Sequence, residues 1–373
     1  MNNDQLTIDN DQLPEGYQQT EVGVIPEDWN IRELGNLGKF KNGINKGSED
    51  FGHGSPFVNL MDVFGISSIS EAEHLGLVNS NDAEKKVYDL REGDVLFIRS
   101  SVKPSGVGLT TVVTRDLPNT VYSGFLIRFR DSENLETDFK KYCFSEEKFR
   151  QRVVANSTVS ANTNINQDNL KKLNLAYPES AAEQRSISQA LSDVDALIAG
   201  LDKAIAKQRA IKTATMQQLL TGKKRLPEFG EGKGDQQTEV GVIPKDWNVV
   251  TIREITSLVT NGFVGKATNH YTDKDDGITY IQGYNVEANS FNFNGIKKVT
   301  PEFHRIHQKS CLRKDDLLTI QTGEVGLTTI VPDSLVGANC HALIISRFKK
   351  EKAYPWFYAH YFNSPIAILR TVF

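Results

Sequence analysis

The sequence predicts an α+β protein in which two tandem β-rich units are joined by one long helix of the coiled-coil type. The first observation is a repeated phrase, because QTEVGVIPEDWN at 19–30 returns as QTEVGVIPKDWN at 237–248, 218 residues later (237 − 19). This period has the length of a domain rather than of a solenoid repeat. Second, both units consist of short Val, Ile, Leu, Phe and Thr runs separated by Gly, Asn, Asp and Ser, which is typical of strands and turns. Third, a stretch rich in helix-forming residues and free of proline lies between them.

The composition sets limits on the class of protein. The 373 residues are 39% hydrophobic and 24% charged, which suits a soluble chain with two cores. The net charge of −4 does not exclude nucleic acid, since DNA binding needs only a local basic surface. Cys143, Cys311 and Cys340 form no CxxC pair, so we expect neither a disulfide framework nor a zinc site and favour a cytoplasmic location. No apolar run reaches the ~18 residues of a membrane span, and residues 1–18 are expected to be disordered.

Past the shared phrase, the two units continue in step. Four further pairs of segments correspond: 31–43 with 252–262, 57–63 with 280–286, 90–98 with 312–320, and 106–113 with 324–331. We expect the entry phrase to be anchored by a buried tryptophan ring. A short amphipathic segment, a strand and an Asn-Gly turn should follow it, and residues 139–154 should form a short helix near the end of the first unit.

Residues 180–220 are expected to form one helix of roughly 60 Å, at ~1.5 Å per residue. Pro178 and Ser180 signal its start, and Thr221-Gly222 followed by Pro227 signals its end. Its apolar side chains are separated alternately by four and three residues, which is the spacing of a coiled-coil seam. We therefore predict pairing with a partner helix through Ile187, Leu191, Val194, Ile198, Leu201 and Ile205.

The second unit is expected to be truncated at its C-terminal end. Tyr361 aligns with Tyr142 (361 − 142 = 219), so Phe373 corresponds to about Val154. Counterparts of residues 155–225, including a second long helix, are absent from the sequence. We therefore expect either an inactive chain or self-association through the helices of two copies, which would recognise an interrupted palindrome.

The segment EQRSISQALSDVDALIAGLDKAIAKQRAIKTATMQQLLTGKKRL at residues 183–226, with IPEDWN and GDVLFIRSS…GVGLTTVV, resembles the DNA-specificity subunit of type I restriction-modification enzymes. The resemblance covers nearly all of the chain. It implies a first target-recognition domain at residues 1–178, a spacer or dimerisation helix at 179–226, and an incomplete second target-recognition domain at 227–373.

The resemblance also implies what the chain does. Each domain would read one half of a bipartite site, and the helix would hold two reading heads at a fixed helical phase. The implied partners are double-stranded DNA, methyltransferase (modification) subunits and, through the complex, the restriction and translocase subunit. The subunit itself would be non-catalytic and would carry no cofactor.

Candidate base-reading side chains lie on the glycine-rich loops, where the backbone can approach DNA and Asn, Gln and Arg can contact base edges. The alternative is that the Asn-Gly and Ser-Gly pairs are simply turns. In the first unit the candidates are Asn42, Asn45, Lys46, Asn59, Arg99, Ser100, Ser101, Lys103, Asn156, Thr158 and Asn162. In the second they are Asn261, Lys266, Gln282, Tyr284, Asn285, Gln321 and Thr322.

The long helix and the segment after it also carry a basic group. Two interpretations stay open, contact with DNA phosphates between half-sites or a solvated helix face. The residues are Lys203, Lys207, Arg209, Lys212, Lys223, Lys224 and Arg225.

Catalytic motifs are incomplete. GFVGKAT at 262–268 has glycines too close together for a phosphate-binding loop, and Ala267 stands where Ser or Thr should follow the lysine. NSPI at 363–366 is a poor match to the NPPF-type methyltransferase motif, and Glu146-Glu147-Lys148 resembles a nuclease ExK on what should be a surface helix. The histidines show no metal spacing. A catalytic nuclease or methyltransferase stays the alternative function, and a purely structural coiled-coil adaptor would not need two variable heads.

Overall fold

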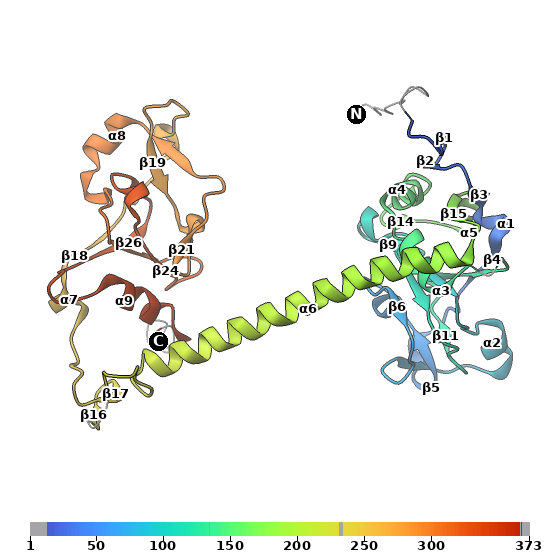
Figure 1. The fold of residues 1–373 in the computed structure, drawn as a ribbon, viewed down its shortest axis with the longest axis horizontal. Helices are drawn as coiled ribbons and strands as arrows, with labels where there is room; N and C mark the ends of the chain where they lie inside the picture. The colour runs from blue at the N-terminus through green and yellow to red at the C-terminus, as the bar shows by residue number, and fades with distance from the viewer. Residues whose placement is uncertain (1–12, 134, 231–233, 366, 368–373) are drawn as a thin grey trace. The chain divides into compact units, whose positions relative to one another are not determined.

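The computed structural model describes residues 13–133, 135–230, 234–365 and 367. The chain divides into two units, residues 1–200 and 201–373, and the division falls within helix α6 (Ala181–Leu219) (Figure 1). Most of residues 1–18 lie outside the described part of the chain. The predicted disorder is wrong for the last of them, because β1 begins at Tyr17.

The first unit combines short helices with several small sheets. Its helices before α6 are α1 (Leu34–Leu37), α2 (Asp82–Val87), α3 (Thr137–Cys143), α4 (Glu147–Ala155) and α5 (Gln167–Lys171). Its strands are β1 (Tyr17–Thr20), β2 (Gly23–Pro26), β3 (Trp29–Glu33), β4 (Gly38–Asn42), β5 (Phe51–Val58), β6 (Ser68–Ile69), β7 (Gly76–Val78), β8 (Val95–Ile98), β9 (Ser100–Ser101), β10 (Thr110–Val113), β11 (Val121–Tyr122), β12 (Leu126–Asp131), β13 (Thr158–Val159), β14 (Thr163–Asn164) and β15 (Asn174–Pro178).

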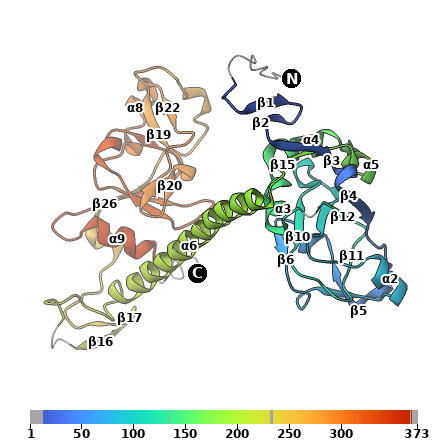
Figure 2. The same ribbon diagram turned by 45° about the vertical axis from the view of Figure 1, so that its right-hand side comes forward.

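The main core of the first unit lies against a five-stranded sheet with the order β4-β12-β8-β10-β6 (Figure 2). Buried phenylalanine rings dominate it, and the ring of Phe144 lies 5.4 Å from those of Phe97 and Phe149 and 5.9 Å from that of Phe129. These edge contacts are the preferred aromatic geometry. Phe144 also interrupts the helix predicted over 139–154, which the structure splits into α3 and α4.

The second unit repeats part of this arrangement. Its helices after α6 are α7 (Ile252–Ile255), α8 (Pro301–Ile306) and α9 (Pro355–Phe362). Its strands are β16 (Asp235–Thr238), β17 (Gly241–Pro244), β18 (Thr256–Asn261), β19 (Ile278–Ile281), β20 (Val286–Glu287), β21 (Ser290–Phe291), β22 (Lys297–Val299), β23 (Leu317–Ile320), β24 (Thr328–Ile330), β25 (Asn339–Cys340) and β26 (Leu343–Phe348). The sheet β18-β26-β23-β24 corresponds to β4-β12-β8-β10, and the sheet β22-β19-β25 corresponds to β7-β5-β11.

The repeated phrase forms the same hairpin in both units. Strands β1 and β2 pair in one, β16 and β17 in the other, with equivalent registers. In each, the threonine hydroxyl donates a 2.7 Å hydrogen bond to a glycine carbonyl, Thr20 to Gly23 and Thr238 to Gly241. The tryptophan after the hairpin is half-buried in both units, so the prediction of a buried ring holds only in part.

Asn42-Gly43 and Asn261-Gly262 prove not to be turns. Gly43 and Gly262 continue the chain from the first sheet toward the second, where Ile44 bridges Ser123 and Phe263 bridges His341 in parallel. A Cβ atom on Gly43 would lie 2.2 Å from the Ser123 carbonyl oxygen, and one on Gly262 would lie 2.6 Å from a neighbouring backbone oxygen. Glycine is required at both places because two backbones approach closely.

An ion pair that the sequence did not reveal is also duplicated. Arg130 Nε donates to Asp94 Oδ1 at 2.6 Å, and Arg347 Nε donates to Asp316 Oδ1 at 2.7 Å. In both pairs Nη2 donates to the other carboxylate oxygen at 2.6 Å. Both carboxylates are fully buried, and two-point pairing of this kind fixes the geometry of neighbouring strands. The repeat therefore preserves polar structure as well as the apolar pattern.

Candidate nucleic-acid interface

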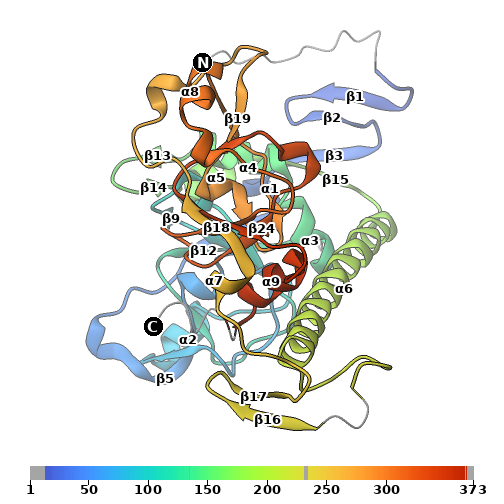
Figure 3. The ribbon, with the colours of Figure 1, turned by 90° about the vertical axis from the view of Figure 1, so that its left-hand side faces the viewer.

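A small three-stranded ribbon in the first unit gathers several of the predicted DNA-reading residues (Figure 3). Its order is β13-β14-β9, with Thr163 opposite Ser101 and Asn164 opposite Ser100. The outer pairing places Thr158 opposite Asn164. Segments more than fifty residues apart in the sequence therefore meet in one surface.

The pleat of the ribbon places its polar residues on one face. Alternate residues of a strand point to opposite sides, so the register aligns one set of side chains outward. Among the paired residues this set comprises Ser100, Thr158 and Asn164. On the opposite face Thr163 is buried, whereas Val159, which pairs with it, is 73% exposed. A β-ribbon of this kind can enter the DNA major groove.

The ribbon depends on a loop that differs between the two units. Residues 99–106 connect β8 to the next shared segment, whereas residues 321–324 make the same connection after β23 with four residues fewer (8 − 4). Both loops close with the same backbone hydrogen bond, from Gly108 N to Ile98 O at 2.7 Å and from Gly326 N to Ile320 O at 2.9 Å. The four extra residues allow the first unit to form β9 and a 3-10 turn over Pro104–Gly106.

Arg150 of α4 supports this loop from below. Its Nη2 donates to the carbonyl oxygens of Ser105 at 3.1 Å and Val107 at 2.7 Å. Its Nη1 is buried without a hydrogen-bond partner, and burial lowers the pKa of the guanidinium. Sequence reasoning missed Arg150 because it lies on a helix more than forty residues from the loop.

Three cations near the ribbon lack an acidic partner among the described residues, as do Lys39, Lys41 and Arg115 elsewhere in the first unit. Within the described residues, no carboxylate lies within ion-pair distance of Arg99, Lys103 or Arg150. Arg128 and Lys140, away from the ribbon, are both paired with aspartates. Unpaired cations are suited to DNA phosphates, which supply most of the affinity for nucleic acid.

The remaining candidates of the first unit have mixed surroundings. Asn45 is exposed. Asn42 accepts a 2.9 Å hydrogen bond from Gln167, Lys46 pairs with Glu84 at 2.9 Å, and Asn59 caps a 3-10 turn through a 2.8 Å bond from Leu60 N. These three side chains have intramolecular partners that a DNA contact would have to replace. Asn156 is exposed at the end of α4, where its Nδ2 donates to Arg152 O at 2.9 Å.

One candidate of the second unit requires correction. Asn285 is fully buried, accepts from Gln282 N at 3.0 Å and donates to Asn292 O at 2.9 Å. Its side chain therefore stabilises a loop and cannot reach DNA in this structure. Tyr284 is 52% exposed, although its hydroxyl donates to Gly295 O at 2.8 Å and accepts from Gln282 Nε2 at 2.9 Å. Accessible candidates in this unit are Asn261, Lys266 and Thr322, while Gln321 is half-buried.

Comparisons with known proteins identify the family of the chain. Residues 26–208 match the family model described as the type I restriction modification DNA specificity domain. The chain belongs to this family. The protein is a specificity subunit of a type I restriction-modification system, and its family is one of DNA sequence recognition.

Two relatives and one solved structure show the extent of the similarity. A Methanocaldococcus jannaschii protein, whose name assigns it to the type I restriction enzyme MjaX as specificity subunit, is 24% identical over 95% of this chain and 81% of its own length. The type I restriction enzyme MjaVIII specificity subunit of the same organism is 21% identical over 84% of this chain and 66% of its own length. A chain from a structure titled for complex assembly and conformational transition of the type I R-M system is 14% identical, covers 92% of this chain and 81% of that chain, and has a TM-score of 0.55.

The long helix of this specificity subunit exposes most of the predicted seam. Ile187 instead packs against the core of the first unit. The other seam residues are between 41% and 55% exposed: Leu191, Val194, Ile198, Leu201 and Ile205. Exposed apolar stripes of this kind are suited to contact with a partner surface.

The basic group near the end of the helix is mostly exposed. This holds for Lys203, Lys207, Arg209, Lys212, Lys223 and Lys224. Arg225 differs, since it pairs with Asp246 at 2.7 Å and its guanidinium lies 5.6 Å from the ring of Trp247. It therefore fastens the end of the helix to the repeated phrase and is not a free phosphate ligand.

The incomplete catalytic motifs have structural roles. Glu146 caps α4 by accepting from Lys148 N at 2.9 Å and Phe149 N at 2.7 Å, and Asn363 makes two hydrogen bonds to the backbone of Thr328.

Among the described residues, no group of three His, Cys, Asp or Glu side chains could hold a metal ion. Nor does any helix in the described ranges have the length and apolar character that crossing a membrane requires.

Proposed function

We propose that each unit of this specificity subunit reads one half of a bipartite DNA site, with the first unit reading through the β13-β14-β9 ribbon. The observation that supports this division is a shared core with different loops. The hairpin, the glycine crossing and the buried Asp-Arg pair recur in both units, whereas the loops at 99–106 and 321–324 differ in length and structure. A constant core with variable loops is suited to present different reading surfaces.

Within the ribbon, Ser100, Asn162 and Asn164 would contact base edges, and Arg99 and Lys103 would face phosphates. Polar side chains on an exposed β-ribbon can discriminate bases by hydrogen bonding in the major groove. Phosphate contacts from unpaired cations set the position of the ribbon on the duplex without specifying sequence. In the second unit, Asn261, Lys266 and Thr322 would serve the same purposes.

Loop exchange tests the division of reading between the units. Residues 99–106 are replaced by the shorter 321–324 sequence, and the methylated motif is mapped by methylome sequencing in cells that contain the modification partner. We expect one half of the motif to change or disappear while the other half stays the same. The matched control is the reverse exchange in the second unit, which should alter only the other half. A change in both halves from either exchange would show that the two units do not read independently.

We also propose that the chain is non-catalytic and works through methyltransferase subunits, and through them a restriction and translocase subunit. The relatives named as specificity subunits support this proposal, as do the structural roles of the Glu146 and Asn363 motifs. The exposed seam on α6 is the surface best suited to a helical partner, whether a modification subunit or a second copy. The same complex would place the protein in the cytoplasm, beside chromosomal DNA. Methyl transfer or DNA cleavage by the purified, partner-free chain would contradict this and favour the catalytic alternative.

A further inference from the structure

Val102 is an unusual residue on the DNA-reading ribbon. It follows β9 directly and is 81% exposed, more than any other large hydrophobic side chain in the described part of the chain. Its neighbours in sequence, Ser101 and Lys103, are polar. Leaving a β-branched apolar side chain in water gains nothing for folding, since its burial would contribute favourable free energy.

The register of the ribbon shows what surrounds this side chain. Thr163 pairs with Ser101, the residue directly before Val102, and the Ser160 amide donates to Asn162 O at 3.0 Å in the turn between β13 and β14. Two strongly exposed apolar side chains, Val102 and Val159, therefore lie among hydrogen-bonding residues of the ribbon, and Val102 is the more exposed of the two. A surface of this composition matches base edges that offer donors, acceptors and an apolar group.

We propose that Val102 reads the C5-methyl group of a thymine in the half-site that the first unit recognises. This inference rests on the proposed function of that unit. In the major groove, the thymine methyl is the apolar group among base-edge donors and acceptors, and apolar side chains are its usual contacts. Flanking polar residues, Ser100 and Asn162 among them, would then read the neighbouring bases by hydrogen bonding.

The support beneath the loop makes Val102 a fixed reader. Gly106 packs so closely on Ser101 that a Cβ atom would lie 2.3 Å from its hydroxyl oxygen. Arg150 holds the carbonyl groups of Ser105 and Val107 from the other side. A side chain held by rigid neighbours loses little conformational entropy on binding, which favours discrimination by a single methyl contact.

The second unit provides an internal contrast. Its corresponding loop, residues 321–324, has the sequence QTGE and contains no apolar side chain. The dependence on a thymine methyl at this loop should therefore affect only the half-site read by the first unit.

Methylome sequencing of three variants, expressed with the modification partner, tests the proposal. V102S removes both methyl groups and should relax one T·A position in one half of the motif. V102T keeps a methyl group and the β-branched shape, so it should retain that position. V87S, at an exposed valine on α2, is the matched control and should leave the motif unchanged. The proposal is wrong if the half-site of the first unit contains no T·A position, or if V102S leaves the motif as it was.

A binding experiment isolates the methyl group itself. In DNA carrying the mapped motif, deoxyuridine replaces the thymidine at the position that V102S relaxes. Wild-type protein should bind this DNA about fourfold more weakly, as burial of one methyl group predicts, whereas V102S should bind both DNAs equally. Equal binding by wild-type protein would overturn the inference while leaving the loop-exchange result intact. Loss of modification-subunit binding by V102S with unchanged DNA binding would instead assign Val102 to a protein contact and overturn it too.

Discussion

The two units share a core but differ in what covers it. In the first unit, β15 pairs with β3 along its whole length, and Leu34 N of α1 donates to Leu173 O at 2.9 Å. Leu34 is completely buried as a result. In the second unit, residues 247–250 form no strand, and Ile252, which begins α7 as Leu34 begins α1, is 36% exposed. We call the repeated phrase and the short helix after it (α1 or α7) the mount. The repeated sequence therefore determines the local structure of the mount, and a distant segment determines whether its apolar side is buried.

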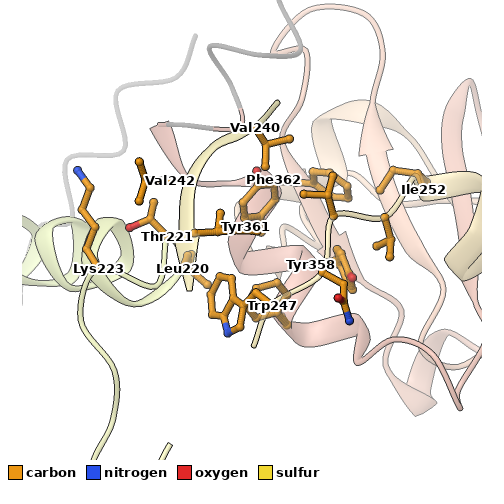
Figure 4. A pocket seen from close by; sticks show the side chains of 15 residues that line it. Leu220, Thr221, Lys223, Val240, Val242, Trp247, Ile252, Tyr358, Tyr361 and Phe362 are labelled. Carbon is orange, nitrogen blue, oxygen red and sulfur yellow. The ribbon is translucent and has the colours of Figure 1, made fainter. Parts of the chain in front are cut away.

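The uncovered side of the second unit is an apolar groove of about 520 Å³ (Figure 4). It is lined by aliphatic and aromatic side chains of the repeated phrase, α7 and α9, among them Val242, Trp247, Ile252, Tyr358 and Phe362. In the first unit, the matching tryptophan, Trp29, donates through Nε1 to Glu183 of α6 at 3.1 Å. In the first unit, the segment from α5 to the start of α6 therefore supplies three contacts to the mount and its strand: the β15 pairing, the Leu173 carbonyl and the Glu183 carboxylate.

The largest expected effect comes from truncating the two matching residues at the mount. L34A should destabilise the first unit by about 2–5 kcal/mol, because it leaves a cavity in a closed core. I252A should cost the second unit no more than about 1 kcal/mol, because the side chain is already partly in water. Urea unfolding followed by hydrogen-exchange mass spectrometry reports the two units separately. Equal losses in both units would show that the groove is closed in solution.

The apolar seam of α6 shows the same contrast between a buried and an exposed apolar side chain. I187E should destabilise the first unit by several kcal/mol, since Ile187 packs on its core and a charge there would be buried without a partner. L191E, one turn further on at an exposed position, should leave unfolding unchanged and reduce co-purification with the modification subunit or self-association measured by light scattering. If L191E retained all partners and the same oligomeric state, the seam would be ordinary surface.

Sequence reasoning reached the repeat, the long helix and the family, because these depend on patterns that are local or literally duplicated. It placed Ser100 and Thr158 among the readers but not in one ribbon, since strand pairing between distant segments leaves no local signal. Asn285 was misassigned because an exposed and a buried asparagine look alike in sequence. For the Asp94-Arg130 and Asp316-Arg347 pairs, the sequence showed only that LREGD and LRKDD share an aspartate. The partner arginines lie on other strands, so the pairing itself left no local pattern.

The smallest expected effect is a difference in acid sensitivity between the units. Directly before the LREGD motif the first unit has Asp89, and directly before the matching LRKDD motif the second unit has Cys311. Burial favours the neutral acid, but the Asp89 carboxylate accepts from Arg91 and lies beside Arg130 and Arg128, and together they hold its pKa below the usual range. Burial raises the pKa of the Cys311 thiol, which therefore stays neutral in acid.

A carboxylate with a depressed folded-state pKa stabilises the fold above its unfolded pKa of about 3.9, and this contribution is lost as the pH falls through the folded value. Between pH 5 and pH 3, the urea midpoint of the first unit should therefore fall further than that of the second. Tryptophan fluorescence separates them, with Trp29 reporting the first unit and Trp247 with Trp356 the second. D89N should lower the midpoint at pH 5 and reduce this extra acid dependence, whereas C311S should not change the acid dependence of the second unit. A wild-type pH profile retained in D89N would show that Asp89 is not the source of the acid response.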